Sequence, residues 1–495
     1  MPAELLHTDV VIVGAGISGI GAAYYLQTEC QGRSYTILEG RDSLGGTWDL
    51  FRYPGVRSDS DMYTLGYRFK PWTDDKSIAE GESILDYLHE TVEEFGIEPH
   101  IRYGHQVTRA EWSSETSTWT LTTTQTDSGD TVRYTCNVLF MCSGYYSYKG
   151  GYTPAFSGLD VFDGPIVHPQ QWPDDLDYTD KDVVVIGSGA TAVTLVPALA
   201  TKARHVTMLQ RSPTYMASQP SVDAVAQRLR KFLPDTLAYR LTRWKNVTYN
   251  HFIYRNTRTR PAVVKKKLLA HVHDELGTDF DVDTHFTPTY DPWDQRLCLV
   301  PDSDLFNAIT SGQASVVTDT IDTFTESGVL LDSGEEIPAD VIVTATGLKL
   351  VTVGDMDFVV DGEPVDFSNT WTYRGLGYSD VPNMVSSFGY INASWTLRVD
   401  LTFPYVCRVL NHMAESGFDR FTPRLRASDT TMPARPWIDD FSSGYVTRDM
   451  AMLPKQGDRE PWLNPQNYPL ERQQFRKAAV EDGVLEFGRA PNAAR

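Results

Sequence analysis

The chain has 495 residues, of which 41% are hydrophobic and 22% charged, so it is long enough for two or three cores and is not a disordered protein. Its formal net charge of -21 argues against nucleic acid as a partner, because binding a polyanion depends on Lys and Arg. Its five cysteines are scattered and form no C-x-x-C pair, which predicts reduced packing thiols in a cytoplasmic protein and no metal site.

The first predicted element is a strand over Thr8–Val13, followed by a glycine-rich turn and a helical pattern. The turn, Gly14-Ala15-Gly16-Ile17-Ser18-Gly19, is the G-x-G-x-x-G fingerprint of a dinucleotide-binding domain. Gly14 makes the tight turn, Gly16 lets backbone N–H groups approach a pyrophosphate, and Gly19 lets the helix pack closely on the strand.

A second strand, Tyr35–Leu38, ends at Glu39, where a carboxylate can accept hydrogen bonds from ribose hydroxyls. Gly45-Gly46-Thr47-Trp48 follows, and a second glycine pair after the acid is the extension seen in FAD-binding members of this fold class. The chain has no cysteine between Cys30 and Cys136, which argues against a redox-active dithiol.

The segment FDGPIVHPQQWP, Phe162–Pro173, is expected to be a shaped, rigid joint between two modules. Its glycine permits a bend, and its three prolines exclude a regular helix or a central strand. The pattern F-x-G-x-x-x-H-x-x-x-W-P, carried by Phe162, Gly164, His168 and Trp172, matches the fingerprint of the Baeyer-Villiger monooxygenases at every fixed position. The chain therefore resembles a class B flavoprotein monooxygenase.

A second dinucleotide module begins with a strand at Val183–Ile186 and the turn Gly187-Ser188-Gly189-Ala190-Thr191-Ala192. Its next strand, His205–Leu209, is followed by Gln210-Arg211-Ser212 where the first module has an acid. A guanidinium pairs well with a phosphate monoester, so this pattern favours NADP(H) over NAD(H).

Each module also has a later strand that ends in a small-residue turn, at 138–144 and 341–347. The sequence thus predicts an α/β protein with two Rossmann-like domains, the second nested in the first. The predicted divisions are 1–150 for the first part of the FAD domain, 151–180 for the linker, 181–345 for the NADP domain with a helical insert at about 220–285, and 346–495 for the second part of the FAD domain with the tail.

The predicted helical insert carries twelve Lys or Arg residues against one acid over residues 228–267. In an acidic chain this is a strong local reversal of charge. Two interpretations remain open: a solvated lid that attracts NADPH, or a peripheral contact with an anionic membrane that supplies lipophilic substrate. No stretch of the sequence predicts a membrane span.

The resemblance implies that FAD occupies the first site, that NADPH binds the second, and that molecular oxygen is the co-substrate. The residues expected to bind cofactor are Gly14, Gly16, Ser18, Gly19, Glu39, Gly46, Thr47, Trp48 and Asp59 in the first module, and Gly187, Ser188, Gly189, Thr191, Arg211, Ser212, Thr346 and Gly347 in the second. Phe162, Gly164, His168 and Trp172 are expected to couple the two modules.

The resemblance also implies a catalytic arginine, Arg296, within PWDQRLCLVPDSDLF, where Gln295-Arg296 replaces the Lys-Arg of many relatives. Asp59 is expected to orient Arg296, with Asp61 as the rival acid. The cation would steady a C4a-peroxyflavin and its adduct with a carbonyl.

The implied reaction is the conversion of lipophilic linear or aryl ketones to esters, with sulfoxidation of thioethers as a side activity. Two alternatives stay open: a flavin monooxygenase that oxygenates nitrogen or sulfur, and a flavin and NADPH redox sensor that oxygenates nothing.

Overall fold

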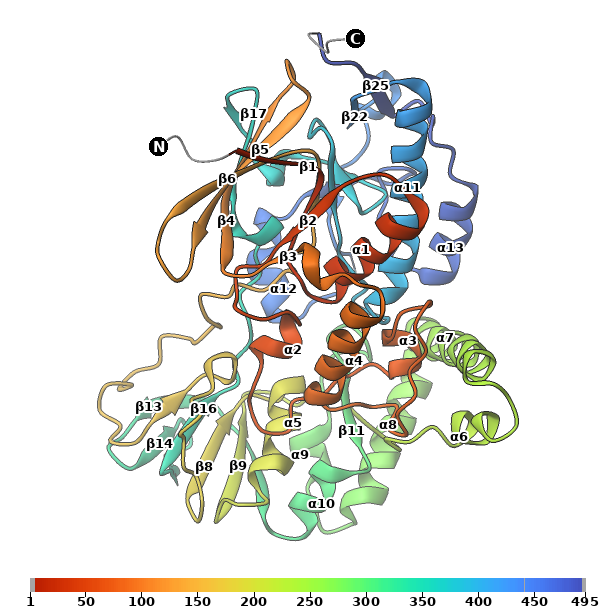
Figure 1. Ribbon diagram of the computed structural model, residues 1–495. Coiled ribbons are helices and arrows are strands. Elements are labelled where there is room, and N and C mark those ends of the chain that lie inside the picture. The colour runs from red at the N-terminus through yellow and green to blue at the C-terminus, as the bar shows by residue number, and fades with distance from the viewer. Residues whose placement is uncertain (1–4, 440, 492–495) are drawn as a thin grey trace.

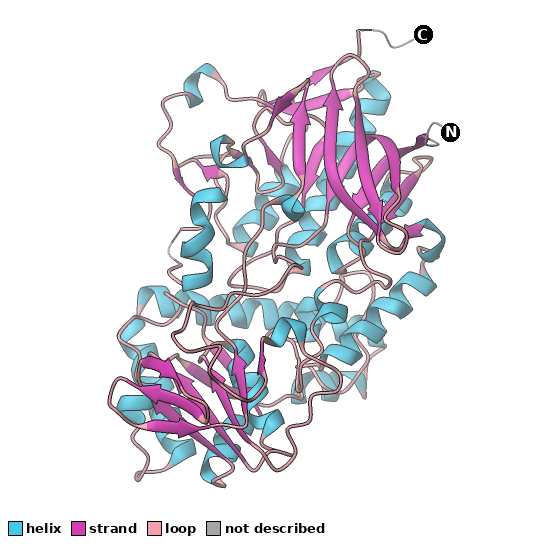
Figure 2. Cartoon of the chain, turned by 90° about the vertical axis from the view of Figure 1, so that its left-hand side faces the viewer, coloured by secondary structure: helices cyan, strands magenta, loops and turns pink. Residues whose placement is uncertain are grey.

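The structure is a computed structural model that describes residues 5–439 and 441–491. Two large β-sheets lie at opposite ends of the molecule, with helices and long loops between them (Figure 2). The chain builds most of the first sheet, then the whole of the second, and then returns to complete the first. The predicted nested α/β fold is confirmed, whereas the residue numbers of the domain boundaries stay a prediction.

The first sheet combines a parallel half with an antiparallel meander, in the order β18-β17-β4-β5-β6-β1-β2-β3, and β21 also pairs with β6. Its strands are β1 (Leu5–Val13), β2 (Tyr35–Leu38), β3 (Ile101–Arg102), β4 (His105–Ser113), β5 (Thr118–Gln125), β6 (Thr131–Met141), β17 (Asp357–Val360), β18 (Glu363–Pro364) and β21 (Met384–Ser386).

The second half of strand β1, residues 10–13, is apolar on both faces because both faces are covered. Val10 and Ile12 point into the core beneath α1 (Ile17–Glu29) and α11 (Thr396–Ser416). Val11 and Val13, which alternate with them, point into a second core that contains Trp119 of the meander. Burial on both sides explains why residues 10–13 form a continuous hydrophobic run.

The second sheet is entirely parallel, in the order β12-β9-β8-β16-β7. Its strands are β7 (Ile166–Val167), β8 (Asp182–Ile186), β9 (His205–Gln210), β12 (Ala314–Thr318) and β16 (Val341–Thr344). One face packs on α5 (Ala190–Leu199) and α10 (Asp304–Thr310), and the other on the small sheet of β13 (Ile321–Phe324), β14 (Gly328–Leu331) and β15 (Glu336–Pro338). The fingerprint segment contributes only the two-residue edge strand β7, as its prolines require.

The predicted insert is helical, and it lies between the paired strands β10 (Met216–Gln219) and β11 (Cys298–Pro301). Its helices are α6 (Ala224–Arg230), α7 (Asp235–Thr259), α8 (Pro261–Leu276) and α9 (Val282–Phe286). Helices α6 and α7 lie at the outer edge of the molecule (Figure 1). Within residues 5–439 and 441–491, no helix combines the length and apolar character needed to cross a membrane.

The C-terminal region returns to the first domain. Helix α13 (Tyr468–Lys477) packs on α11, and a buried ion pair between Arg398 and Glu471 joins them. Strand β25 (Leu485–Gly488) pairs with β22 (Arg420–Pro423). Within the tail, Val484 and Leu485 are buried in the core of the first domain.

The remaining α-helices and strands are α2 (Thr47–Leu50), α3 (Met62–Leu65), α4 (Gly81–Glu94), α12 (Gly444–Asp449), β19 (Thr372–Tyr373), β20 (Gly377–Tyr378), β23 (Arg435–Pro436) and β24 (Lys455–Gln456). All five cysteines are buried and free, as predicted for packing thiols.

Candidate active site

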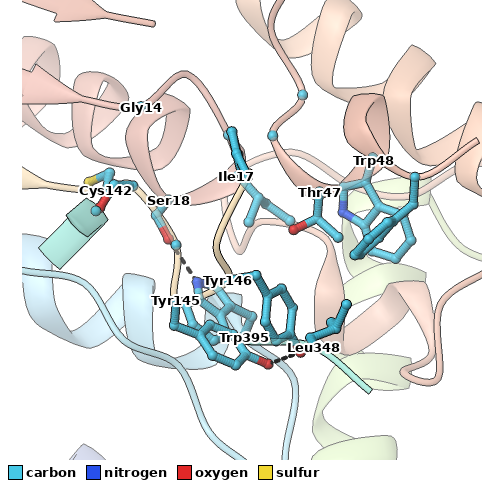
Figure 3. Close-up of a pocket in the computed structure, with 18 of the residues that line it drawn as sticks. Gly14, Ile17, Ser18, Thr47, Trp48, Cys142, Tyr145, Tyr146, Leu348 and Trp395 are labelled. Atoms are coloured by element: carbon cyan, nitrogen blue, oxygen red, sulfur yellow. Dashed lines mark hydrogen bonds between the residues drawn. The ribbon is translucent and has the colours of Figure 1, made fainter. Parts of the chain in front are cut away.

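A cavity of about 830 Å³ lies where the two dinucleotide modules meet. Its walls come from the β1–α1 turn, residues 45–60, the segment after β6 and the start of α5. The start of α5 belongs to the second module, so the two modules share this space. Figure 3 shows side chains from the first turn, from residues 47 and 48 and from the segment after β6 converging on it, together with Leu348 and Trp395.

The glycines of the first turn form a backbone cradle in the cavity wall. Gly14 has φ +104, and a Cβ there would lie 2.6 Å from the carbonyl oxygen of Cys142. Gly16 and Gly46 face each other, since a Cβ on Gly46 would lie 3.1 Å from the Cα of Gly16. Bare backbone on both sides of this gap is what the pyrophosphate of a dinucleotide requires, so these residues fit FAD.

Glu39 lies where the sequence placed it, at the end of β2 and in the cavity wall. Its carboxylate accepts hydrogen bonds from the backbone N–H groups of Ala15 at 2.7 Å and Arg41 at 2.9 Å. Burial raises its pKa, although these two hydrogen bonds act in the opposite direction. Each carboxylate oxygen keeps a second lone pair for a ribose hydroxyl.

The glycine turn of the second module, which begins at Gly187, repeats the geometry of the first turn, but no other segment of the described chain packs against Gly189. Gly187 has φ +131, and a Cβ there would lie 2.4 Å from the carbonyl oxygen of Ala345. A Cβ on Gly189 would meet nothing within 4 Å. Arg211 and Ser212 are exposed, and no acid among the described residues pairs with Arg211. An exposed cation beside an open glycine turn is suited to a ligand phosphate.

Arg296 and Asp59 meet in the cavity wall, although they are far apart in the sequence. The Nη2 atom of Arg296 lies 3.4 Å from Oδ2 of Asp59, and its Nη1 donates to the carbonyl oxygen of Ile391 at 3.0 Å. Burial by itself lowers the pKa of Arg296, but Asp59 and the nearby tyrosines Tyr445, Tyr145 and Tyr146 together outweigh it, so the pKa is raised. The arginine is therefore a fixed cation in the cavity.

Asp61, the rival acid, does not approach Arg296. It caps α3 by accepting from the backbone N–H of Thr64 at 3.1 Å, and it accepts from Nδ2 of Asn246 at 2.9 Å. Its role is structural, and Asp59 is the partner of Arg296.

The fingerprint histidine is a fully hydrogen-bonded linker. The N–H of Gln170 donates to Nδ1 of His168 at 3.2 Å, so Nε2 carries the proton and donates to the carbonyl oxygen of Gly347 at 3.0 Å. The side chain of Gln170 donates in turn to the carbonyl oxygen of Ser147. Burial lowers the pKa of His168, which keeps the ring neutral. His168 and Gln170 thus link the fingerprint segment to Gly347 and Ser147, and the coupling role of His168 stays a prediction.

The other fingerprint residues pack within the second module. Phe162 is buried, and Trp172 contacts Tyr178 edge to face. A Cβ on Gly164 would lie 2.5 Å from the carbonyl oxygen of Asp340, so this position requires glycine.

The cavity has an aromatic wall that includes two tyrosines the sequence did not single out, Tyr145 and Tyr146. The rings of Tyr145 and Trp395 stack with their centroids 5.1 Å apart, and the hydroxyls of Tyr145 and Tyr146 are hydrogen-bonded at 2.5 Å. Nε1 of Trp395 donates to Oγ of Ser18 at 2.7 Å, which ties the start of α11 to the first turn (Figure 3). The signal was available, because the tyrosines directly follow the carboxyl end of β6, where α/β sheets bind ligands.

The structure divides the predicted residues into two groups. Those that line the cavity are Gly14, Gly16, Ser18, Glu39, Gly46, Thr47, Trp48, Asp59, Thr191 and Arg296. Those outside its lining are Gly19, Gly187, Ser188, Gly189, Arg211, Ser212, Thr346 and Gly347, together with the four fingerprint residues. A Cβ on Gly19 would lie 1.9 Å from the carbonyl oxygen of Gly14, so Gly19 serves helix packing.

Two dinucleotide folds that share a cavity with a fixed cation define a two-cofactor oxidoreductase. Residues 7–353 match the flavin-binding monooxygenase-like family. The chain is 51% identical over 486 residues to the FAD-containing monooxygenase EthA of Mycobacterium tuberculosis, covering 98% of each chain. It is 46% identical to the probable FAD-binding monooxygenase AlmA of Acinetobacter baylyi, covering 97% of this chain and 96% of the relative. The chain belongs to the flavin-binding monooxygenase-like family and is a flavoprotein monooxygenase.

Solved structures agree on the fold. A steroid monooxygenase bound to NADP matches with a TM-score of 0.79 at 23% identity, covering 98% of this chain and 100% of the other. An open form of cyclohexanone monooxygenase matches with a TM-score of 0.76 at 19% identity, covering 97% and 99%. The predicted enzyme class and its cofactors, FAD and NADPH, agree with these findings.

Proposed function

We propose that the protein is a Baeyer-Villiger monooxygenase that converts lipophilic linear or aryl ketones to esters and oxidises thioethers as a side activity. In the overall reaction, one ketone, one O₂, one NADPH and one proton give one ester, one water and one NADP⁺. FAD, when bound, would take hydride from NADPH and activate the oxygen that is inserted.

The observation that carries this proposal is the fixed cation in the shared cavity. Insertion of oxygen next to a carbonyl develops negative charge on the carbonyl oxygen, and a preorganised cation in a site shielded from water stabilises that charge. Arg296 supplies the cation, and Asp59 at 3.4 Å and the carbonyl of Ile391 at 3.0 Å hold its orientation. Because the Asp59 side chain is only partly exposed, water screens the attraction between Asp59 and Arg296 incompletely.

The cofactor roles follow from the two glycine turns. Gly16 and Gly46 would leave room for the FAD pyrophosphate, and Glu39 would accept from its ribose. Gly189 and Arg211 would receive NADPH from the open side of the second module. His168 would act by positioning the Gly347 loop, because its two ring nitrogens already have partners.

The aromatic wall supports an apolar substrate. Tyr145, Tyr146 and Trp395 offer ring faces and edges to the cavity, and such surfaces bind apolar chains and rings. These half-buried rings would also help to exclude water from the cavity, which would protect a reactive oxygenated intermediate from hydrolysis.

The test is to incubate the purified yellow protein with NADPH, oxygen and 2-decanone, and to measure ester by mass spectrometry beside NADPH loss. Ester formed in proportion to the NADPH consumed is the expected result. A parallel incubation with a thioether identifies the first alternative: sulfoxide without any ester would mean a heteroatom oxygenase. NADPH consumption that gives only hydrogen peroxide with both substrates would favour the redox sensor.

A further inference from the structure

The insert gathers most of the exposed apolar side chains of the described chain. Ten of the fifteen large hydrophobic residues with high exposure lie between residues 222 and 263. Among them Phe232 is 80% exposed, Trp244 66%, Phe252 59% and Tyr249 58%. A cluster of this kind, aromatic and confined to one subdomain, marks a contact surface rather than scattered exposure.

On α7 these residues form a stripe along one face of the helix. Leu237, Leu241, Trp244 and Phe252 recur at helical spacing and are all exposed. We call the outward faces of α6 and α7, with the loop that joins them, the α6–α7 surface; it spans residues 224–259. Its apolar stripe points away from the core of its own chain.

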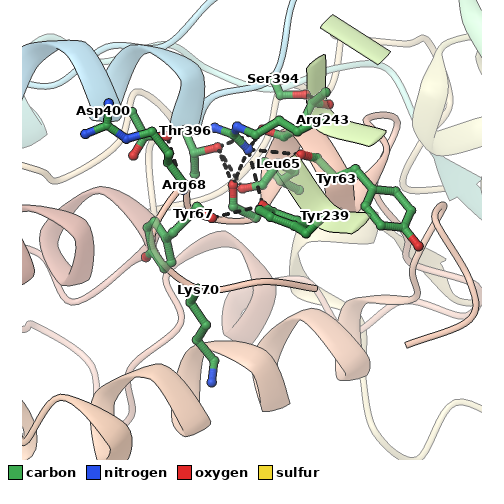
Figure 4. Close-up of polar contacts among 12 residues, drawn as sticks. Tyr63, Leu65, Tyr67, Arg68, Lys70, Tyr239, Arg243, Ser394, Thr396 and Asp400 are labelled. Carbon is green, nitrogen blue, oxygen red and sulfur yellow. Dashed lines mark hydrogen bonds and ion pairs between the residues drawn. The ribbon is translucent and has the colours of Figure 1, made fainter. Parts of the chain in front are cut away.

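The opposite face of α7 is locked onto the first domain, so the helix cannot turn to bury the stripe. The Nη1 atom of Arg243 donates to the carbonyl oxygens of Tyr63, Thr64 and Gly66 at 3.0, 3.1 and 2.7 Å. Its Nη2 pairs with Oδ2 of Asp400 at 2.7 Å, and both charged groups are buried. Figure 4 shows this cluster around the guanidinium.

Cations flank the stripe. Lys231, Arg240 and Arg255 are exposed, and no acid among residues 5–439 and 441–491 forms an ion pair with them. The single acid of this region, Asp235, lies 3.7 Å from Arg230. The α6–α7 surface is thus locally basic in a chain of net charge -21.

We propose that the α6–α7 surface docks the enzyme on an anionic phospholipid membrane. A membrane of this kind explains both the cations and the apolar stripe: lipid phosphates attract the cations, while aromatic rings enter the headgroup region beside them. Docking at this surface would hold α3 near the lipid, and α3 includes Leu65 of the cavity wall. The contact is independent of the oxygenation reaction and needs no substrate.

The test is flotation of the FAD-loaded enzyme with vesicles of phosphatidylcholine alone or mixed with phosphatidylglycerol, at low and high salt. The expected result is flotation with the mixed vesicles, weakened by salt, and little with phosphatidylcholine alone. Since no turnover is measured, failure here is distinguishable from failure of the proposed reaction. Equal behaviour with the two vesicle types, or no flotation with either, would overturn the proposal and leave a protein as the occupant.

Three variants separate the contributions. The double change Trp244→Ser with Phe252→Ser and the double change Arg240→Glu with Arg255→Glu should each lower binding to mixed vesicles by about tenfold or more. Leu470→Ser is the matched control, because Leu470 is 43% exposed on α13 outside this surface. Full binding by both double variants, with flavin retained, would contradict the proposal.

Discussion

The two dinucleotide modules begin with the same local geometry. In the first, the N–H of Gly14 donates to the carbonyl oxygen of Leu38 at 2.8 Å, and in the second the N–H of Gly187 donates to that of Leu209 at 2.8 Å. Each glycine has positive φ, and a Cβ on it would collide with the carbonyl oxygen of a residue just after a later strand. The two modules thus share the same strand–turn–helix arrangement.

The modules differ in what surrounds that design. In the first, Gly16 faces Gly46 across a narrow gap, and the acid at the end of the second strand is buried. In the second, Gly189 meets open space and Arg211 is exposed. Enclosure suits a resident cofactor and openness suits one that must leave after each turnover. The difference in packing, rather than the fingerprint, separates the two roles.

The largest expected effect is at the enclosed turn. Gly14→Ala forces a Cβ to 2.6 Å from a backbone carbonyl at φ +104, which costs about 3 kcal/mol or more and should yield a flavin-free, unstable protein. Gly189→Ala is the matched control: it should stay yellow and fold normally, with a raised KM for NADPH. Flavin absorbance and thermal unfolding measure both. A stable yellow Gly14→Ala protein would break the comparison.

Next in size is the loss of the shared cation. Arg296→Ala should bind FAD and still consume NADPH, but ester formation should fall by about a hundredfold to a thousandfold, because the developing oxyanion loses its cation. Hydrogen peroxide should replace the ester. Asp59→Asn should cause a smaller loss, because Arg296 keeps its contact with Ile391. Ester formed at the normal rate by Arg296→Ala would refute the assigned role.

A smaller effect is expected at the open module. Arg211→Ala should raise the KM for NADPH by about tenfold to a hundredfold, the value of a lost charge-assisted hydrogen bond of about 1.5–3 kcal/mol, and should leave NADH unchanged. Arg204→Ala is the control, since Arg204 lies in the same module but is paired with Asp182, the first residue of β8. Unchanged NADPH affinity in Arg211→Ala would remove the basis for assigning NADP(H) to this turn.

The smallest effect concerns the joint between the modules. Burial lowers the pKa of His168 in the folded protein below its unfolded value of about 6.5. Above the unfolded pKa the ring is neutral in both states, and the fold has its full stability. As pH falls towards the folded pKa, the unfolded state takes up a proton first, and this stability is lost. His168→Gln cannot be protonated. The melting temperature of the wild type should therefore fall more steeply than that of the variant below about pH 6.5. If the melting temperatures of the two proteins fall with the same slope below that pH, protonation of His168 is not coupled to unfolding.

The sequence could predict the features that depend on neighbouring residues. The runs at Thr8–Val13 and Val183–Ile186, each followed by a glycine turn, fix strand, turn and phosphate cradle locally, because β-branched residues favour strands and only glycine tolerates the turn. The helical insert, and a joint with no α-helix but only the short 3-10 turn Pro169–Gln171, followed from composition and proline placement in the same way.

Only the tertiary structure decided which distant residues meet. The choice of Asp59 over its rival Asp61 rested on resemblance alone, and it was folding that brought the first to Arg296 and the second to the start of α3. The stacking of Tyr145 on Trp395, and the burial of Arg243 on the inner face of the basic helix α7, likewise join segments that are far apart along the chain. No local pattern encodes such pairs, because they are set by how the two domains and the insert pack, and packing is a property of the whole chain.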